Sequence, residues 1–324
     1  MDQYIHDCLR NNSRNLIKGM TKPQQKAFQD MVKGLLAKGK PILKEMASVF
    51  DSKPKKQSER FSRHLRNLNL EEKVSEFALK KAKKLANENT VIAYDLTDIA
   101  KPHAKKMEKI DNVFDGSKRK IEKGFLLHGV GINGFLIKLE IHDGKEDFLP
   151  QIRQKIVQEI SEKLNKKGIW VFDRGNDSRN FFKFLSQKEK LRFVARLRHN
   201  RCIADAKTGV IFKLQNMKCG SYEVFLVNDK GKPENSFRYR LVISNDSKTK
   251  QPIRLLTNLN SNFSTKKIVD TYLSRWGVES AFRRVKTHFA LEKIRVLKYQ
   301  NLNNLVAIIQ FVFNVLKILF YSAN

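Results

Sequence analysis

The chain has 324 residues, of which 41% are hydrophobic, and 64 lysines and arginines outnumber 33 acidic residues. This hydrophobic content, with 22 phenylalanines, excludes a disordered chain and can build a substantial core. Three cysteines without a C-x-x-C pair exclude a disulfide framework and a zinc knuckle. The net charge of +31 attracts polyanions, above all nucleic acid, with an acidic membrane surface as the weaker alternative.

Residues 1–88 are expected to form a helical, strongly basic N-terminal domain. Apolar residues recur there at helical spacing, as in the stripe that begins at Phe28 and reaches Leu35. Breaks near Pro41 and at 51–57 predict several helices of ordinary length. No helix-turn-helix pattern stands out, so we expect this domain to bind DNA through phosphate contacts.

The pattern changes to strands after residue 90. The apolar run 91–95 ends in a carboxylate, Asp95, and the runs 124–132 and 134–142 are joined through Asn133-Gly134, a good tight-turn pair. These three strands are expected to form an antiparallel meander. The connection between the first two carries eight cations from Lys101 to Lys123, which favour DNA-backbone contacts over a merely solvated loop. The cations that we assign to DNA are Lys105, Lys106 and Arg119.

A crossover is predicted next. Residues 148–165 have helical periodicity, Gly168 is expected to cap that helix, and the apolar run 169–173 ends in Asp173. A strand at 169–173 can pair parallel to 91–95 through this helix, which would make Asp95 and Asp173 neighbours at the rim of the sheet. A helix at 178–187 and a strand at 191–197 follow, and short strands fill a β-rich insertion at 202–257.

A helix is predicted over 268–289, and its polar face is unusual. Four polar residues lie within about 60° of one another on the helical wheel. They are Tyr272, Arg275, Glu279 and Lys286. The neighbouring stripe of Val278, Phe282, Val285 and Phe289 is expected to face the core. Taken alone, a glutamate between two cations is usually a solvated charge pair, so the weight of this face depends on the two upstream aspartates.

The ends of the chain give no sign of a membrane protein. The N-terminus lacks an apolar signal-peptide core, and the apolar stretch 302–321 is interrupted by asparagines, a glutamine and a lysine. Those interruptions favour a buried or partner-facing helix over a membrane span. We therefore expect a soluble, intracellular protein.

The order of elements and the positions of the acids resemble the ribonuclease-H-like fold, an α/β mixed sheet flanked by helices. Together with the Y-x2-R-x3-E-x6-K spacing, they resemble the DDE transposases of bacterial insertion sequences, and within them the insertion-sequence-four family. The resemblance covers residues 90–300. It implies a catalytic domain at 89–201, the β-rich insertion at 202–257, completion of the catalytic domain at 258–300 and a C-terminal apolar helix at 301–324.

The resemblance implies that Asp95, Asp173 and Glu279 are the catalytic carboxylates. Three converging carboxylates repel one another unless hard cations lie between them, so we expect two Mg²⁺ ions, with Mn²⁺ as substitute, about 3.5–4 Å apart. Family members cut DNA at transposon terminal repeats and join the exposed 3′-hydroxyl to a second phosphodiester, acting as homodimers. The phosphate-binding role would fall to Tyr272, Arg275 and Lys286, and a bacterial cytoplasmic location follows.

Each predicted acid has a rival in sequence. Asp98 and Asp177 follow the two aspartates by three and four residues, and their expected place beyond the strands favours cap or turn roles. Glu292 lacks the tyrosine and arginine at the right offsets. We expect Trp276 to pack against a neighbouring element rather than to stack on a base. We expect His128 to be a hydrogen-bonded structural residue.

Two other functions remain open on the sequence. A metal-dependent nuclease of the same fold would share the three carboxylates without joining DNA strands. A catalytically inactive DNA-binding derivative of a transposase would bind DNA without cutting it.

Overall fold

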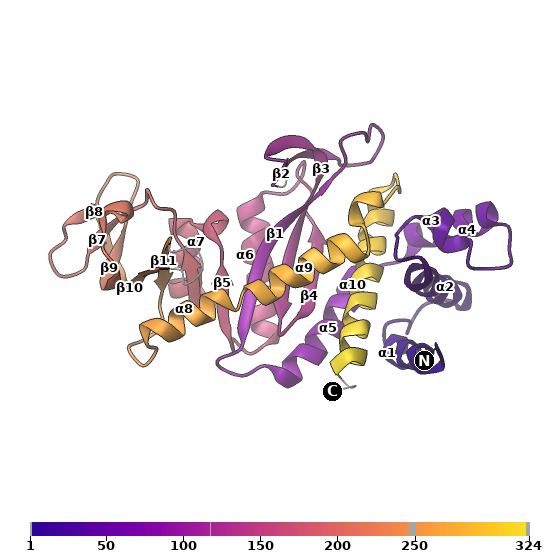
Figure 1. Ribbon diagram of the computed structural model, residues 1–324, viewed down its shortest axis with the longest axis horizontal. Coiled ribbons are helices and arrows are strands. Elements are labelled where there is room, and N and C mark those ends of the chain that lie inside the picture. The colour runs from indigo at the N-terminus through magenta and orange to yellow at the C-terminus, as the bar shows by residue number, and fades with distance from the viewer. Residues whose placement is uncertain (1, 117, 246–250, 322–324) are drawn as a thin grey trace. The chain divides into compact units, whose positions relative to one another are not determined.

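A computed structural model describes residues 2–116, 118–245 and 251–321 (Figure 1). The chain divides into two compact units. Unit 1 comprises Met1–Leu85, Leu96–Leu149 and Val278–Asn324, and unit 2 comprises Ala86–Asp95 and Pro150–Gly277. Four segments named in the sequence analysis include residues outside these ranges. The segment 1–88 includes residue 1, and 101–123 includes residue 117. The segment 202–257 includes 246–250, and 301–324 includes 322–324.

Helices dominate unit 1. The N-terminal region is helical as predicted, and Phe28 and Leu35 are buried in its core. Thr21 caps the second helix by accepting a hydrogen bond from the backbone of Gln24, and Pro54 begins the fourth. The helices are α1 (Asp2–Ser13), α2 (Lys22–Lys38), α3 (Leu43–Ala47), α4 (Pro54–Asn67), α5 (Glu71–Leu85), α9 (Trp276–His288, from Val278 onward), the 3-10 turn η4 (Leu291–Lys293) and α10 (Tyr299–Tyr321).

The long C-terminal helix α10 is a core helix. It packs against α1, α2, α4, α5 and the strand β4 (Phe135–Ile141). By length and composition Tyr299–Leu319 could cross a membrane, but 72% of its apolar window is buried inside the protein. Its polar residues bond to the backbone: Asn314 Oδ1 accepts from Leu136 N at 2.9 Å, and its Nδ2 donates to Leu136 O at 2.8 Å. The polar interruptions therefore mark a buried helix, one of the two outcomes that the sequence favoured.

The strands of unit 1 form an antiparallel group next to β1 (Val91–Ala100). Residues 96–100 of β1 belong to unit 1. The long strand β3 (Lys120–Ile132) pairs antiparallel with β2 (Asp111–Asp115) through its first half and with β4 through its second half. Asn133 and Gly134 have φ of 49° and 81°, as a primed hairpin turn requires, so the predicted turn is confirmed.

Two expectations for this region are wrong. The first strand does not end at Asp95 but continues to Ala100. The basic connection is not a loop throughout, because β2 lies within it. Both errors have one cause: polar residues interrupt the apolar pattern at 95–98 and again through β2 and the start of β3, so a search for apolar runs misses these strand segments.

Unit 2 is built on parallel strands that continue into antiparallel ones. Residues 91–94 of β1 pair parallel with β5 (Ile169–Phe172), which pairs parallel with β6 (Phe193–Arg196). The parallel pairing of β1 and β5 through α6 (Leu149–Lys163) confirms the predicted crossover. From β6 the order runs on through β11 (Pro252–Thr257), β10 (Pro233–Asn245), β9 (Gly220–Val227), β7 (Cys202–Asp205) and β8 (Ile211–Lys213).

The strand β5 buries both of its faces, as a central parallel strand must. On one side, Trp170 Nε1 donates to Ser161 Oγ of α6 at 3.0 Å, and Phe172 contacts Phe181 of α7 (Arg179–Lys183). On the other side, Ile169 and Val171 join a core that includes residues of α8 (Thr265–Leu273). Helices therefore cover both faces of the sheet in unit 2. Three short helical turns lie in the connections between its strands: η1 (Arg174–Asn176), the π-helical η2 (Phe184–Lys188) and η3 (Leu214–Asn216).

Gly168 does not cap α6, because the helix ends at Lys163 and the turn after it uses Asn165 and Lys166 at φ of 55° and 57°. Its φ is 98°, and an added Cβ would lie 2.7 Å from Ile92 Cδ1. The glycine is needed for the close approach of β5 to β1. The chain as a whole has the mixed α/β class that the sequence predicted, consistent with a ribonuclease-H-like fold.

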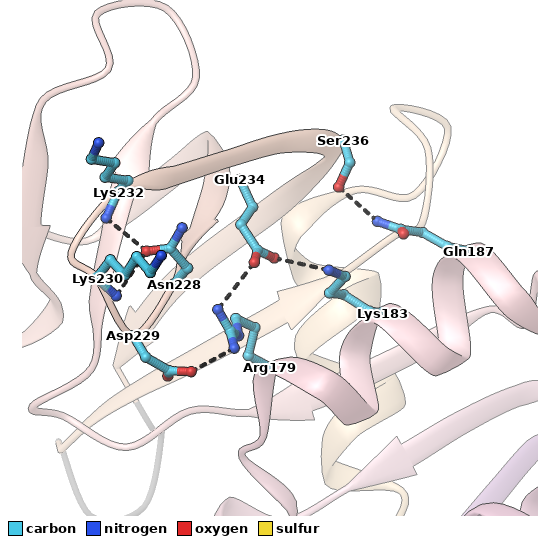
Figure 2. A network of polar contacts seen from close by, with 9 residues as sticks. All are labelled: Arg179, Lys183, Gln187, Asn228, Asp229, Lys230, Lys232, Glu234 and Ser236. Carbon is cyan, nitrogen blue, oxygen red and sulfur yellow. Dashed lines mark hydrogen bonds and ion pairs between the residues drawn. The ribbon is translucent and has the colours of Figure 1, made fainter.

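The β-rich segment is tied to α7 by a polar network (Figure 2). Arg179 Nη2 lies 2.7 Å from Asp229 Oδ2, and its Nη1 lies 3.0 Å from Glu234 Oε1. Lys183 Nζ reaches the other oxygen of Glu234 at 3.4 Å. Two cations of α7 are thus paired with carboxylates of the β9–β10 hairpin, so they stabilise this docking and add little to the positive surface.

Candidate active site

Asp95 and Asp173 occupy equivalent places on neighbouring strands. In the parallel pairing of β1 with β5, Tyr94 lies opposite Phe172, and each aspartate is the next residue in the chain, Asp95 within β1 and Asp173 directly after the end of β5. Both carboxylates therefore leave the sheet at the same edge of unit 2, as the sequence predicted.

Local structure holds the Asp173 carboxylate in one orientation. Asp173 is the N-cap of η1, and its Oδ1 accepts hydrogen bonds from Gly175 N at 3.0 Å and from Asn176 Nδ2 at 2.6 Å. Because both donors use Oδ1, Oδ2 is the oxygen that a ligand outside this turn would meet. Asn176 is itself 1% exposed, so its amide has little freedom to turn away.

Arg153 of α6 holds Asn176 in place. Its Nη1 donates to Asn176 Oδ1 at 3.1 Å, and its guanidinium lies 3.9 Å from the centre of the Phe181 ring. Burial lowers the pKa of Arg153, and the charge of nearby Asp173 works in the opposite direction. Arg153, Asn176 and Asp173 thus form a chain in which a buried cation fixes an amide, and the amide fixes a carboxylate.

Sequence reasoning missed Arg153 and Asn176, although one signal was present. Arg153 lies three and seven residues before Ile156 and Ile160, on the buried stripe of α6. A cation on an apolar stripe needs a partner within the fold, and that requirement could have identified it.

Asp177, the rival of Asp173, has a structural role. Its side chain is 1% exposed, its Oδ2 accepts from Arg198 N at 2.8 Å, and its Oδ1 accepts from Arg201 Nε at 2.5 Å. These bonds anchor the turn between β6 and β7, in agreement with the turn role expected from its position.

The helix predicted over 268–289 is broken. It consists of α8, which ends at Leu273, and α9, which begins at Trp276, with Ser274 and Arg275 between them. The backbone hydrogen bonds at the break run from Ser274 N to Asp270 O and from Arg275 N to Tyr272 O, the second tightening the chain into a turn. The four polar residues therefore do not share one continuous helix face.

Arg275 and Tyr272 lie on the unit 2 side of this break. Arg275 Nη1 is 3.9 Å from Asp95 Oδ2, and its guanidinium is 5.5 Å from the centre of the Tyr272 ring. The Tyr272 side chain is 2% exposed and packs in the core with Ile169 and Val171. Its ring is thus a buried support beside Arg275; its predicted contact with DNA stays a prediction.

The helix α9 carries Glu279 and Lys286 in unit 1. It crosses β3 at two glycines, because a Cβ on Gly129 would lie 2.0 Å from Phe282 Cζ and one on Gly131 would lie 2.6 Å from Val278 Cγ1. Val278, Phe282, Val285 and Phe289 are all buried, which confirms the predicted core stripe. Glu279 is half-buried in the first turn, where the helix dipole favours a carboxylate.

Lys286 contacts the other rival acid. Its Nζ lies 3.2 Å from Oδ1 of Asp98. Asp98 lies within β1, so the expectation that it falls beyond the strand is wrong. This pairing gives Asp98 a charge-balancing role, and the predicted DNA contact of Lys286 stays a prediction.

The remaining predicted residues differ in exposure. Lys105, Lys106 and Arg119 are exposed in unit 1, as DNA contacts must be, and their binding stays a prediction. Trp276 is 51% exposed and so less packed than expected. His128 is fully buried, with its Nε2 3.2 Å from His142 Nδ1, which agrees with a structural role.

The donor set suits a hard divalent cation. Asp95 and Asp173 offer carboxylate oxygens at one sheet edge, the ligand type that Mg²⁺ and Mn²⁺ prefer. Within the described residues, no group of three or more His, Cys, Asp or Glu side chains forms a metal cluster. The structure brings together two of the three predicted carboxylates, in unit 2, and Glu279 belongs to unit 1.

The fold and this site define a mixed α/β protein with paired carboxylates at the edge of a parallel sheet. The family model described as "Transposase DDE domain" matches residues 86–315, well over half of the chain. The chain therefore belongs to the transposase DDE domain family, and this membership indicates DNA cleavage linked to transposition. No curated protein matches the chain.

Proposed function

We propose that this protein is a cut-and-paste transposase of a bacterial insertion sequence, of the insertion-sequence-four family. It cleaves DNA at the terminal inverted repeats of its element and transfers the ends into target DNA. The observation that carries this proposal is the register of β1 and β5, which sets Asp95 and Asp173 side by side in a chain of the DDE family.

Asp95, Asp173 and Glu279 are proposed as the catalytic carboxylates and metal ligands. Two bound Mg²⁺ ions, or Mn²⁺ in their place, would supply the Lewis acidity that phosphodiester cleavage and joining need. Because the hydrogen bonds to Asp173 use Oδ1, its Oδ2 would be the oxygen that binds the metal. Arg275, with its guanidinium near Asp95, would restrain that carboxylate and bind the phosphate at the cut end.

DNA is the proposed partner along much of the basic surface. Arg275 and Lys286 would bind phosphates near the cleaved end, with the buried ring of Tyr272 supporting Arg275, and Lys105, Lys106 and Arg119 would contact the flanking backbone. The net charge of +31 supports a phosphate-dominated interface whose affinity falls steeply with salt. We further propose that a homodimer joins the two ends and that the protein acts in the bacterial cytoplasm.

A cleavage assay on a supercoiled plasmid that carries the terminal repeats of the element tests this function. With Mg²⁺ or Mn²⁺ we expect breaks at the repeat ends, followed by joined products. The Glu279→Gln variant keeps the shape of the side chain but loses its charge, so it should bind DNA without cutting it.

Two other outcomes would replace the proposal. Scattered nicks without joined products would identify a hydrolytic nuclease of the same fold. DNA binding without any cleavage, in wild type and variant alike, would identify an inactive derivative.

A further inference from the structure

The β2–β3 ribbon of unit 1 exposes two large apolar side chains that the fold does not bury. Phe114 is 62% exposed and Ile121 is 71% exposed, and the two lie directly opposite each other in the antiparallel pairing. A cross-strand pair of this kind stabilises a ribbon only weakly. Two adjacent exposed apolar residues on a short ribbon are also unfavourable in water. This exposure indicates that a binding partner covers them.

The two faces of the ribbon differ in charge. Side chains alternate along each strand, so Asn112, Phe114, Ile121 and Lys123 share the exposed face. The acids lie on the opposite face with Val113, where Asp115 is 3% exposed and Glu122 is 9% exposed. The exposed face therefore carries apolar groups and a cation, without a carboxylate.

Two acids of the ribbon are paired with lysines, and Lys118 Nζ lies 3.5 Å from Asp115 Oδ2. Lys118 Nζ lies 3.0 Å from Glu122, and Lys120 Nζ lies 2.6 Å from the same carboxylate. These bonds hold the pKa of Glu122 below its usual range. The remaining cations, Lys123 on the exposed face and Arg119 at the turn, are exposed beside the apolar pair. A polyanion is the partner whose charge complements this face.

The ribbon is firmly rooted in the sheet. Lys101 N donates to Lys123 O at 2.6 Å, which joins the base of the ribbon to the end of β1. A Cβ on Gly124 would lie 2.5 Å from Ile99 O and 2.6 Å from Val113 Cγ2, so glycine lets the three strands pass closely. A rigid ribbon can press side chains into a partner without first being ordered.

We propose that the β2–β3 ribbon enters a groove of duplex DNA and wedges Phe114 and Ile121 against a base step, with Arg119 and Lys123 on the flanking phosphates. Two-stranded ribbons fit DNA grooves, and apolar side chains of this kind unstack base steps and bend the duplex. The inference deepens the proposed function, since it rests on DNA being the partner, but it does not depend on cleavage.

The test compares double variants of the full-length chain on a short duplex labelled with donor and acceptor dyes at its ends, without divalent metal. Phe114→Thr/Ile121→Thr keeps strand-forming residues and removes the wedge. We expect roughly tenfold weaker binding and less bending, with the salt dependence unchanged. Arg119→Gln/Lys123→Gln should lower the salt slope by about one for each cation and leave the bend of the bound duplex in place.

The matched control is Ile211→Thr/Phe212→Thr on the edge strand β8, whose side chains are 41% and 40% exposed. It should leave affinity and bending unchanged. Unchanged affinity and bending in the Phe114/Ile121 variant would overturn the proposal, and so would a loss of self-association in light scattering, which would assign the pair to a second copy of the chain. A wild type that bends DNA but never cuts it would refute the proposed function alone.

Discussion

Two buried polar networks, one in each unit, end on different kinds of group. In unit 1, the amide of Asn314 on α10 bonds to both backbone groups of Leu136, at the edge of the sheet. In unit 2, Arg153 and Asn176 end on the carboxylate of Asp173, which stays half-exposed. A network that satisfies backbone groups serves the fold, whereas one that orients a carboxylate at a sheet edge serves a ligand.

The largest effect should come from Asp173 itself. In Asp173→Asn the amide oxygen still accepts the hydrogen bonds of the turn, but the charge that holds a divalent cation is gone. We expect end cleavage to be abolished and the melting temperature to change little. Asp177→Asn is the matched control: it weakens the pair with Arg201 and should lower the melting temperature while the folded fraction still cuts. The reverse pattern would assign the catalytic role to Asp177.

Asn314→Ala tests the structural network. It leaves the buried N–H of Leu136 without its acceptor, while Leu136 O keeps its bond from Gln310. We expect the free energy of unfolding to fall by about 2–3 kcal/mol, measured by urea denaturation, with cleavage per folded molecule retained. Gln300→Ala is the control, because Gln300 bonds to Leu68 O from an exposed position and should cost about 0.5 kcal/mol or less.

Asn176→Ala tests whether the second network acts on the site. Its loss should leave Asp173 with the backbone bond from Gly175 alone. Removing such an outer partner of a metal ligand usually costs roughly 10- to 100-fold in activity or metal affinity. The informative measurement is the Mg²⁺ concentration for half-maximal cleavage, which should rise. A loss of stability at an unchanged Mg²⁺ requirement would make Asn176 a structural residue like Asn314.

The smallest effect concerns Lys101, a buried cation that bonds to the backbone. Its Nζ donates to Ile294 O at 2.6 Å and also to Glu292 O, in the chain that follows α9. Burial lowers the pKa of Lys101 to about 8 from 10.5. Between these values the unfolded chain binds more protons than the folded one, so Lys101 makes the free energy of unfolding rise with pH. We expect a gain of about 1–2 kcal/mol over this window relative to Lys101→Met, and equal slopes for both proteins would refute it.

Several patterns that are local in sequence gave correct predictions. The alternation and apolar runs predicted β5 and the hairpin of β3 and β4, and Asn133-Gly134 adopts the positive φ values that its residue types favour. The crossover rule then predicted the parallel pairing of β1 with β5, in which Asp95 and Asp173 directly follow the paired residues Tyr94 and Phe172. The core stripe of α9 followed from helical periodicity in the same way.

Contacts between distant segments decided the rest. The break at Ser274 and Arg275, the burial of Tyr272 and the pairing of Lys286 with Asp98 depend on neighbours that periodicity does not reveal. Arg153 and Asn176 lie 23 residues apart, and only folding makes them partners of Asp173. The sequence by itself determined the class of fold and which residue types could do the chemistry, because strand and helix periods and turn preferences are local. The tertiary structure decided which charged groups are held by the fold, because burial and ion pairing arise only when separate elements pack together.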